Sequence, residues 1–253
     1  MAQERFLDGP LTDILAQWRH YFTLLAPRAG DAIIDVGCDT GDADCLLAAD
    51  FPEIAQVVAI EADDRRYHRA IERWQARGAD PRVTFRQADA RDLPFGEGTF
   101  DRAICAEMLE FVAPPDQALA ELRRVLKPGG VALVVHTDWE TQMFATRDRQ
   151  RARRAVLAFA GEGQGADLGR RLNHLCRRAG FRDVEPSVYT VLNAEWRDTL
   201  VAPRVVALMK EWLKESPDFG SEDLAEWAAD IEAAVAEGSF CYAVNRFVCR
   251  CVK

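Results

Sequence analysis

The stretch that indicates the fold reads Ala32-Ile33-Ile34-Asp35-Val36-Gly37-Cys38-Asp39-Thr40-Gly41. Its first half is a short apolar run, which is typical of a buried strand. A turn from Gly37 to Gly41 follows, and residues 42–49 then favour a helix. Small residues in such a turn let the backbone approach a ligand closely, and the helix that follows offers it unpaired N–H groups. The stretch therefore predicts a strand, a ligand-binding turn and a helix.

Strands and helices alternate in the same way along the first 136 residues. The next expected elements are strands at 56–61, 82–85, 101–105 and 131–135, and helices at 63–77 and 116–126. This alternation predicts a parallel sheet that is covered by helices on both faces. Ligands of such sheets bind beyond the carboxyl ends of the strands. We therefore expect one site, surrounded by the turns after Val36, Ile60, Phe85, Ile104 and Val135.

The rest of the chain is less regular. Its expected elements are helices at 147–160 and 168–179, and antiparallel edge strands at 181–192 and 240–252. The segment between those two strands is predicted to be helical and carries Trp196, Trp212 and Trp227. We therefore predict a single α/β domain over residues 1–253, built on a doubly wound, mostly parallel, seven-stranded Rossmann-like sheet. A helical cap at residues 193–238 is inserted before its last strand.

The composition excludes several classes of protein. With 49% hydrophobic residues among 253, the chain can build a core, which excludes disordered, collagen-like and coiled-coil proteins. The net charge of −9 is unlike the basic footprint of a protein that binds nucleic acid. No apolar run approaches the roughly 20 residues of a membrane span, and the start lacks the pattern of a secretory signal. We therefore expect a cytoplasmic protein without a nucleic-acid or membrane partner.

The seven cysteines form no Cys-x-x-Cys pair. An odd number without that spacing predicts neither a disulfide framework nor a zinc site. Cys249 and Cys251 stand two residues apart, on one face of an expected strand. A buried pair of small apolar side chains is favoured there over a redox or metal site. We predict no metal.

Acidic residues decide which ligand the first turn suits. The dinucleotide pattern Gly-x-Gly-x-x-Gly is not met, because positions 39 and 42 are both Asp. A pyrophosphate would be repelled by these acids and by Asp35 and Asp44, whereas a ligand with an ammonium and a sulfonium suits them. At the ends of the next two strands, Glu61 is placed to accept hydrogen bonds from a ribose diol, and Asp89 from an exocyclic amine. Together these acids favour a nucleoside ligand.

These residues resemble class I S-adenosylmethionine (SAM) methyltransferases, and within them the small-molecule branch that includes the ubiquinone and menaquinone biosynthesis type. Residues 35–41 are similar to the family's glycine-rich first motif, Glu61 to the acid that binds the ribose hydroxyls, and Asp89 to the acid that holds the adenine amine. The resemblance is specific up to Val135 and loose after it. It implies SAM as cofactor, S-adenosylhomocysteine as product, and these cofactor-binding residues: Asp35, Gly37, Cys38, Gly41, Glu61, Ala62, Asp89, Ala90 and Cys105.

One residue departs from the family's pattern. The family usually has glycine at the position of Asp39. On the favoured interpretation, Asp tolerates the backbone geometry, because it is among the better non-glycine residues at positive φ, and the cofactor still binds. On the other, the bulkier, charged side chain crowds the methionine moiety and weakens SAM binding.

Catalytic and substrate-binding candidates follow the fifth expected strand. Transfer from a sulfonium is an in-line displacement, so positioning and exclusion of water are the protein's main tasks. A base is needed only if the acceptor must lose a proton. His136 and Asp138 are candidates for that base, and packing or hydrogen bonding within the loop is an equal alternative. Tyr21, His136 and Trp139 are candidates for contact with the substrate, although ordinary packing is favoured for Tyr21.

The residues after the fourth strand indicate the acceptor class. Methylases that act on base amines resemble one another in an Asn/Asp-Pro-Pro-aromatic tetrapeptide there. This chain reads Ala106-Glu107-Met108-Leu109 instead. Together with the acidic charge, this sequence favours a small-molecule substrate. Farther along, residues 147–154 carry five Arg and one Asp. They are expected to form a solvated helix face, and a clamp for an acidic substrate or a docking site for a carrier protein is the alternative.

We therefore predict a SAM-dependent methyltransferase that moves a methyl group to an O, N or C atom of a small organic molecule, for example a secondary metabolite. The alternative is a protein of the same fold that binds the cofactor without methyl transfer, as a regulatory module or as the catalyst of a different reaction. Asp39 favours the alternative, and Glu61 and Asp89 favour the methyltransferase. The oligomeric state stays open between monomer and homodimer.

Overall fold

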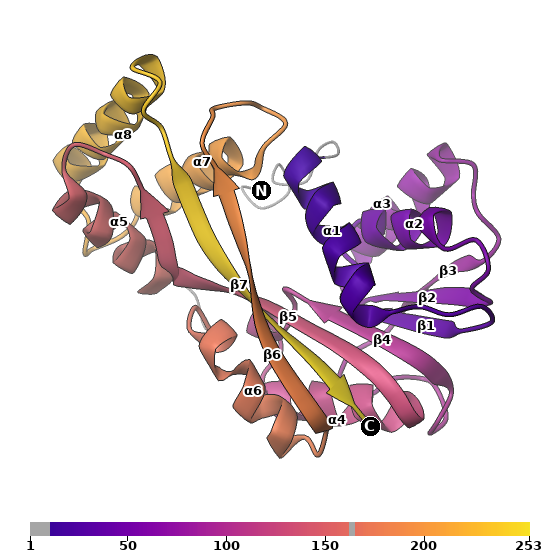
Figure 1. Ribbon diagram of the computed structural model, residues 1–253. Helices are drawn as coiled ribbons and strands as arrows, with labels where there is room; N and C mark the ends of the chain where they lie inside the picture. Colours follow the sequence, from indigo (N-terminus) through magenta and orange to yellow (C-terminus); the bar gives the residue numbers. More distant parts are fainter. Residues whose placement is uncertain (1–10, 162–164) are drawn as a thin grey trace. The chain divides into compact units, whose positions relative to one another are not determined.

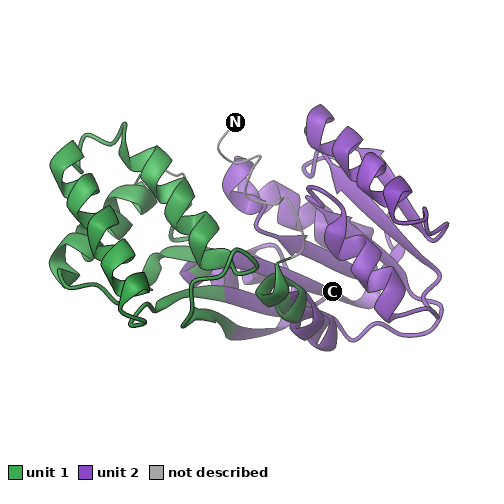
Figure 2. Cartoon of the chain, turned by 90° about the horizontal axis from the view of Figure 1, so that it is seen from above, with its two compact units in different colours: residues 1–17, 137–169, 188–246 green, residues 18–136, 170–187, 247–253 purple. Residues whose placement is uncertain are grey.

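The computed structural model describes residues 11–161 and 165–253 (Figure 1). Its seven strands form one sheet in the order β3-β2-β1-β4-β5-β7-β6. The chain divides into two compact units (Figure 2). Unit 1 comprises residues 1–17, 137–169 and 188–246, and unit 2 comprises residues 18–136, 170–187 and 247–253. The predicted doubly wound α/β fold is confirmed. The prediction of one domain with a cap at residues 193–238 stays a prediction.

Unit 2 contains the parallel part of the sheet. Its elements are α1 (Thr12–Leu25, from residue 18 on), β1 (Ala32–Val36), α2 (Asp42–Asp50), β2 (Gln56–Glu61), α3 (Asp64–Ala76), β3 (Val83–Gln87), β4 (Phe100–Ala106), a 3₁₀ helix (Leu109–Phe111), α4 (Pro115–Val125), the first part of β5 (Leu126–Phe144) and most of α6 (Leu168–Arg178). Strand β1 pairs in parallel with both β2 and β4, β2 with β3, and β4 with β5. The carboxyl ends of these strands therefore lie along one edge.

The sequence explains these elements locally. The apolar runs of β1 and β2 are almost wholly buried, because helices cover both faces of a parallel sheet. Helix α3 begins where the Asp63 side chain accepts a hydrogen bond from the Arg66 N–H, an ordinary N-cap. Helix α4 begins with Pro115. Proline costs no hydrogen bond there, because the N–H of the first helical residue has no partner within the helix.

Unit 1 has a core of its own, built around three helices. These are α5 (Arg149–Gly161), α7 (Val201–Leu213) and α8 (Ser221–Ala236), and they accompany the remaining parts of β5, β6 (Arg182–Asn193) and β7 (Tyr242–Val252). Trp227 is fully buried in this core, and Trp196 and Trp212 pack against it. The predicted helical segment is thus confirmed as two helices, and its tryptophans contribute to packing.

Two expectations about strands are wrong. β5 was expected to end at Val135 but continues to Phe144, so residues 136–140 lie within it and not in a turn. The reason is that His136, Thr137 and Asp138 are buried polar residues, which a search for apolar runs does not recognise as strand. In addition, β7 lies between β5 and β6, so of the two closing strands only β6 is at an edge. β7 is antiparallel to β5: Gly129 N–H donates to Lys253 O, and Ala145 N–H to Cys241 O.

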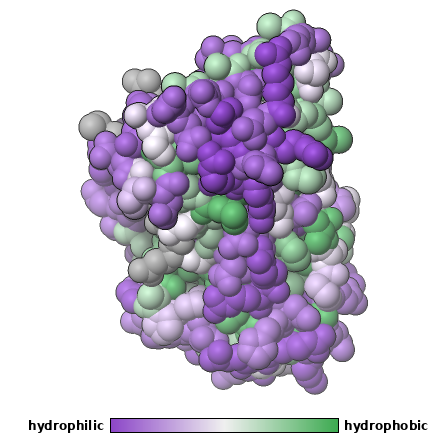
Figure 3. Space-filling view, turned by 90° about the vertical axis from the view of Figure 1, so that its left-hand side faces the viewer, coloured by the Kyte–Doolittle hydropathy of each residue, from purple (hydrophilic) through white to green (hydrophobic). Residues whose placement is uncertain are grey.

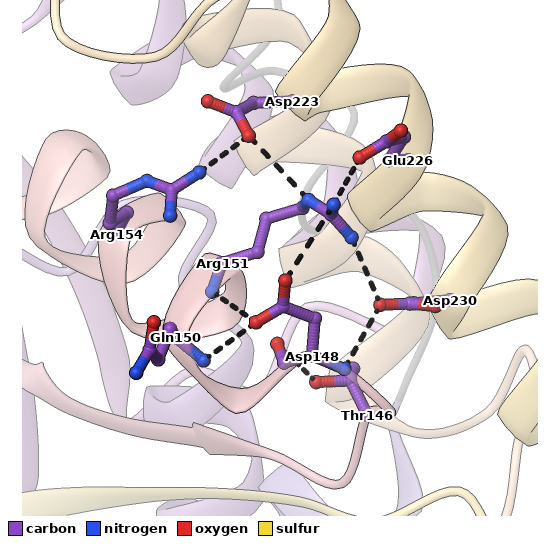
Figure 4. A network of polar contacts seen from close by, with 8 residues as sticks. All are labelled: Thr146, Asp148, Gln150, Arg151, Arg154, Asp223, Glu226 and Asp230. Carbon is purple, nitrogen blue, oxygen red and sulfur yellow. Dashed lines mark hydrogen bonds and ion pairs between the residues drawn. The ribbon is translucent and has the colours of Figure 1, made fainter.

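The arginine run at residues 147–154 is not a solvated face throughout. Arg151 is 18% exposed and makes ion pairs with Asp148, Asp223, Glu226 and Asp230 (Figure 4). Arg154 also pairs with Asp223, and Arg147 with Glu237. The run thus joins α5 to the acidic helix α8. Figure 3, which views the molecule from the side where these helices lie, shows a mostly hydrophilic surface there.

The remaining expectations concern cysteines and membranes. Cys249 and Cys251 are buried, as predicted. All seven cysteines are free thiols in this structure. No helix in the described ranges has both the length and the apolar composition of a membrane span.

Candidate functional site

The turn after β1 is packed tightly against the end of β2. The N–H groups of Gly37 and Cys38 both donate to the Ile60 carbonyl, at 2.8 and 2.9 Å. Gly37 and Gly41 have φ values of +87° and +68°. A Cβ at Gly37 would lie 2.5 Å from Met108 Cγ, and one at Gly41 would lie 2.6 Å from Phe85 Cε1. Both positions therefore require glycine, for backbone conformation and for space.

Asp39 has a positive φ, like Gly37 and Gly41 in the same turn. Its φ is +50°, a value that Asp tolerates better than most residues. Its carboxylate lies 3.7 Å from the Arg66 guanidinium, and burial raises its pKa while Arg66 opposes that rise. The backbone geometry and this ion pair agree with the interpretation that Asp39 is tolerated in place of glycine.

Glu61 links the first turn to the end of the second strand. The Asp39 N–H donates to Glu61 Oε2 at 3.0 Å, and the Asp63 N–H donates to Oε1 at 2.9 Å. The side chain is buried. Each carboxylate oxygen accepts more than one hydrogen bond, so both keep capacity for a ligand hydroxyl. The carboxylate is therefore held in a fixed position at the end of β2.

Asp35 and Asp44 form a buried acidic pair beside the same turn. Asp35 lies on β1 and is 2% exposed; Asp44 lies in the first turn of α2 and is 1% exposed. Burial raises the pKa of Asp44 to about 7, and burial together with Asp44 raises the pKa of Asp35 well above its usual range. Sequence reasoning had noted Asp44 only as one of four acids in this region. Its burial depends on packing, which the local sequence does not show.

Asp89 lies beyond β3 and is engaged by a neighbouring residue. Its carboxylate accepts hydrogen bonds from the Arg91 guanidinium and from the Arg91 N–H, which lower its pKa. It is largely exposed. The Ala62 carbonyl nearby accepts from Gln87 Nε2 at 3.2 Å, and Ala90 is buried. An amine ligand would therefore share Asp89 with Arg91.

The structure brings the predicted cofactor-binding residues to one edge of the sheet in unit 2. Cys38 and Cys105 are buried, and burial raises the pKa of both thiols well above the usual range, so neither is a reactive thiolate. The other members of the set lie at the ends of β1 to β3 or in the turns that follow: Asp35, Gly37, Gly41, Glu61, Ala62, Asp89 and Ala90.

The predicted catalytic and substrate residues are divided between the units. In unit 2, His136 is fully buried with Nε2 at 3.9 Å from Glu110 Oε2, and Tyr21 is buried with its ring edge-on to Trp18. Asp138 and Trp139 belong to unit 1. Asp138 is fully buried, and the Trp139 ring packs edge-on against Phe159. Their catalytic and substrate roles stay predictions.

Sequence reasoning missed that the turn after β4 packs against the turn after β1. Glu107 has a φ of +53°, Met108 packs against Gly37, and Phe111 is 56% exposed. The Arg66 guanidinium lies 5.8 Å from the centre of the Phe111 ring, a cation–π distance. Arg66 therefore contacts both Phe111 and Asp39. An aromatic residue in the turn after a strand was the signal available in the sequence.

Two features of the site are compatible with a SAM-like ligand. Its buried acids, Asp35 and Asp44, suit a cation and oppose a pyrophosphate. Its turn requires glycine at Gly37 and Gly41, and Glu61 is fixed at the next strand end. SAM, when bound, supplies a methyl group on a positively charged sulfur.

Comparison with known proteins shows which family this segment is similar to. Residues 34–134 match the model of the family described as methyltransferase domain. A ubiquinone/menaquinone biosynthesis C-methyltransferase from Teredinibacter turnerae is 35% identical over 119 residues, which are 47% of this chain and 48% of the relative. The predicted resemblance is confirmed for this segment: residues 34–134 are similar to the methyltransferase-domain family. The chain spans about half the length of the curated relatives it matches.

Solved structures share the fold over most of the chain. A SAM-dependent methyltransferase from Aquifex aeolicus has a TM-score of 0.57 and 16% identity, with 98% of each chain covered. The [4+2]-cyclase SpnF has a TM-score of 0.53 and 22% identity, with 92% of this chain and 80% of that chain covered. At these identities the likeness establishes the fold alone.

Proposed function

We propose that this protein binds SAM at the carboxyl ends of β1, β2 and β3 and transfers its methyl group to an O, N or C atom of a small organic molecule. The observation that carries the proposal is Glu61, whose carboxylate is fixed between the Asp39 and Asp63 N–H groups at the end of β2. The methyltransferase-domain match of residues 34–134 supports it. S-adenosylhomocysteine is the product that such a transfer leaves.

The residues of the site divide the work of binding. Glu61 accepts hydrogen bonds from the ribose hydroxyls, and Asp89 accepts from the adenine amine. Gly37 and Gly41 let the turn adopt positive φ and pack closely against Met108 and Phe85, which fixes the backbone that faces the ligand. Positioning and exclusion of water then supply most of the rate enhancement. Where the acceptor must lose a proton, His136 or Asp138 takes it.

A small molecule is the acceptor class that the residues favour. The chain carries a net charge of −9, and the turn after β4 lacks the tetrapeptide of base-amine methylases. Tyr21, His136 and Trp139 are the proposed substrate contacts. A cytoplasmic location agrees with seven unpaired cysteines. The proposal includes neither a nucleic-acid nor a membrane partner, and it is compatible with a monomer or a homodimer.

The test uses SAM with a deuterated methyl group. The full chain is incubated with it and, separately, with a metabolite fraction, transfer RNA or a protein fraction, and mass spectrometry locates the label. We expect label in the metabolite fraction and S-adenosylhomocysteine in equal amount. Label confined to RNA or protein would contradict the small-molecule proposal. Tight binding of SAM by calorimetry without label in any fraction would favour the alternative, a cofactor-binding protein that does not transfer methyl groups.

A further inference from the structure

Strand β6 is an edge strand whose two halves differ. It ends the sheet and has only β7 beside it (Figure 1). An edge strand presents a row of backbone N–H and C=O groups that can pair with another strand, and charged side chains or proline usually prevent such pairing. The first half of β6 carries these residues: Arg182, Asp183, Glu185 and Pro186. Residues 187–193 carry none of them, so only the second half is open to pairing.

The second half of β6 has one exposed and one buried face. Val188 and Leu192 are 49% and 62% exposed, and Thr190 between them is exposed as well. Side chains alternate across a strand, so these three share a face. On the opposite face, Val191 is buried in the core of unit 1 and Tyr189 packs against that core. The outer face therefore presents two large apolar side chains along an unprotected edge.

The order of these side chains is symmetric about Thr190. When two copies of the strand are paired in antiparallel about a two-fold axis at Thr190, Val188 of each copy lies directly opposite Leu192 of the other. The two threonines then face each other, and Tyr189 lies opposite Val191. Apolar pairs and Thr–Thr pairs are stabilising in directly opposed positions. The segment is thus complementary to itself, as a two-fold interface requires.

Charge also favours a second copy as the partner at this edge. The chain has a net charge of −9, so two copies repel one another in most orientations. Residues 187–194 contain no charged side chain, although 29% of the chain is charged. The repulsion between two copies is therefore smallest where these segments meet. A basic partner would instead be attracted to exposed acids, which this segment lacks.

We propose that residues 188–192 of β6 pair in antiparallel with the same residues of a second copy and so form a reversible homodimer. The pairing adds main-chain hydrogen bonds between the two edges and covers Val188 and Leu192 of both copies. Five residues from each copy make an interface at the small end of the range for specific complexes, so the dimer is weak. It is independent of the proposed function, because none of these residues belongs to the cofactor-binding set.

Sedimentation equilibrium of the full chain over about 1–200 µM measures the association. We expect a monomer–dimer equilibrium with a dissociation constant of about 10–100 µM, the scale of a small transient interface. Leu192→Lys places a charge at the seam and should raise that constant at least about tenfold. Met143→Lys is the matched control: Met143 is 64% exposed, but β7 separates its strand from β6, so this variant should associate as the parent does.

Both substituted side chains are exposed, so both variants should fold, and urea unfolding checks this. A chain that stays monomeric at the highest concentration would overturn the proposal. A dimer that Leu192→Lys does not weaken, or that both lysine variants weaken equally, would also overturn it.

A cysteine on the two-fold axis tests the register itself. Directly opposed residues of antiparallel strands have Cα atoms about 4.5–5.5 Å apart, which is within reach of a disulfide. With copper phenanthroline and oxygen as oxidant, we therefore expect Thr190→Cys to form a disulfide-linked dimer. The natural cysteines are buried or partly buried, so the parent shows the background, and Met143→Cys should not exceed it. No linked dimer in Thr190→Cys, or equally fast linkage in Met143→Cys, would contradict the proposed pairing.

Discussion

Two groups of carboxylates in this molecule look alike in the sequence and differ in the structure. In unit 1, Asp148, Asp223, Glu226 and Asp230 surround the guanidinium of Arg151. In unit 2, the main groups that shift the pKa values of Asp35 and Asp44 include no cation among the described residues. The first group is paired with a cation of the chain, and among the described residues the second has no such cation among the groups that shift its pKa values.

The difference separates acids that join two helices from acids that lie beside the proposed cofactor site. The acids of α8 pair with the arginines of α5 and join two helices of one core (Figure 4). Neither a clamp for an acidic substrate nor a carrier-docking site is supported by such paired arginines. The acids beside the glycine turn keep unused capacity for hydrogen bonds. A count of charges along the chain cannot make this distinction, because it depends on which residues meet in the fold.

The largest effect is expected at Arg151. Arg151→Met leaves the surrounding acids without their central cation, and we expect it to lower the free energy of unfolding by about 2–3 kcal/mol, since removing one partner of a buried ion pair leaves uncompensated charge. Urea unfolding at pH 7 measures it. Arg154→Met is the control: this side chain is 51% exposed, and exposed pairs contribute little. Equal losses in the two variants would contradict the comparison.

The next effect concerns Glu61. Glu61→Ala is expected to weaken SAM binding by about 1–3 kcal/mol, the scale for losing hydrogen bonds to a charged group. Calorimetry measures it. Glu53→Ala removes an exposed carboxylate that precedes the same strand and should leave the affinity unchanged. An unaltered affinity in Glu61→Ala would remove the ribose assignment.

The third prediction concerns the stability of the ligand-free protein. The folded state holds the proton of Asp44 up to a pKa of about 7, whereas an unfolded Asp releases it near pH 4. The folded state thus binds more protons between these values, and the pair's contribution to stability falls as the pH rises through them.

Asp44→Asn removes this dependence. Relative to the parent, the variant should gain stability as the pH rises from 5 to 7, at up to about 1.4 kcal/mol per pH unit. Urea unfolding of both proteins at pH 5, 6, 7 and 8 measures the difference. A difference that does not change with pH would show that the pair does not retain a proton in the ligand-free state.

The smallest effect is expected at Asp39. If Asp is tolerated there, Asp39→Gly changes SAM affinity by less than about 0.7 kcal/mol. If its side chain crowds the methionine moiety, Asp39→Gly makes SAM binding more favourable by more than about 0.7 kcal/mol. Asp39→Asn also tolerates positive φ but lacks the charge, so comparing both variants by calorimetry separates the side chain's charge from its bulk.

The sequence predicted the fold where elements are made of local patterns. β2 was predicted with its exact bounds, because Gln56–Glu61 is a clear apolar run that ends in an acid. β5 was predicted too short, because buried polar residues such as His136 break the apolar pattern without ending the strand. The partners of Arg151 were missed for another reason: Glu226 lies 75 residues away in the chain, and no local pattern connects them.

The site was predictable in part for similar reasons. Backbone conformation and space dictate glycine at Gly37 and Gly41, and Glu61 is the acid that ends the apolar run of β2, so local sequence identifies all three. Asp44 follows no such rule. An acid in the first turn of a helix usually indicates a favourable interaction with the helix dipole at the surface, and only the packing of α2 shows that this one is buried.

The most direct test of the account is a crystal structure of the full chain with S-adenosylhomocysteine. We expect a nucleoside at the ends of β1, β2 and β3, with both ribose hydroxyls on the Glu61 carboxylate. A nucleoside bound elsewhere, or empty strand ends at saturating ligand, would contradict it.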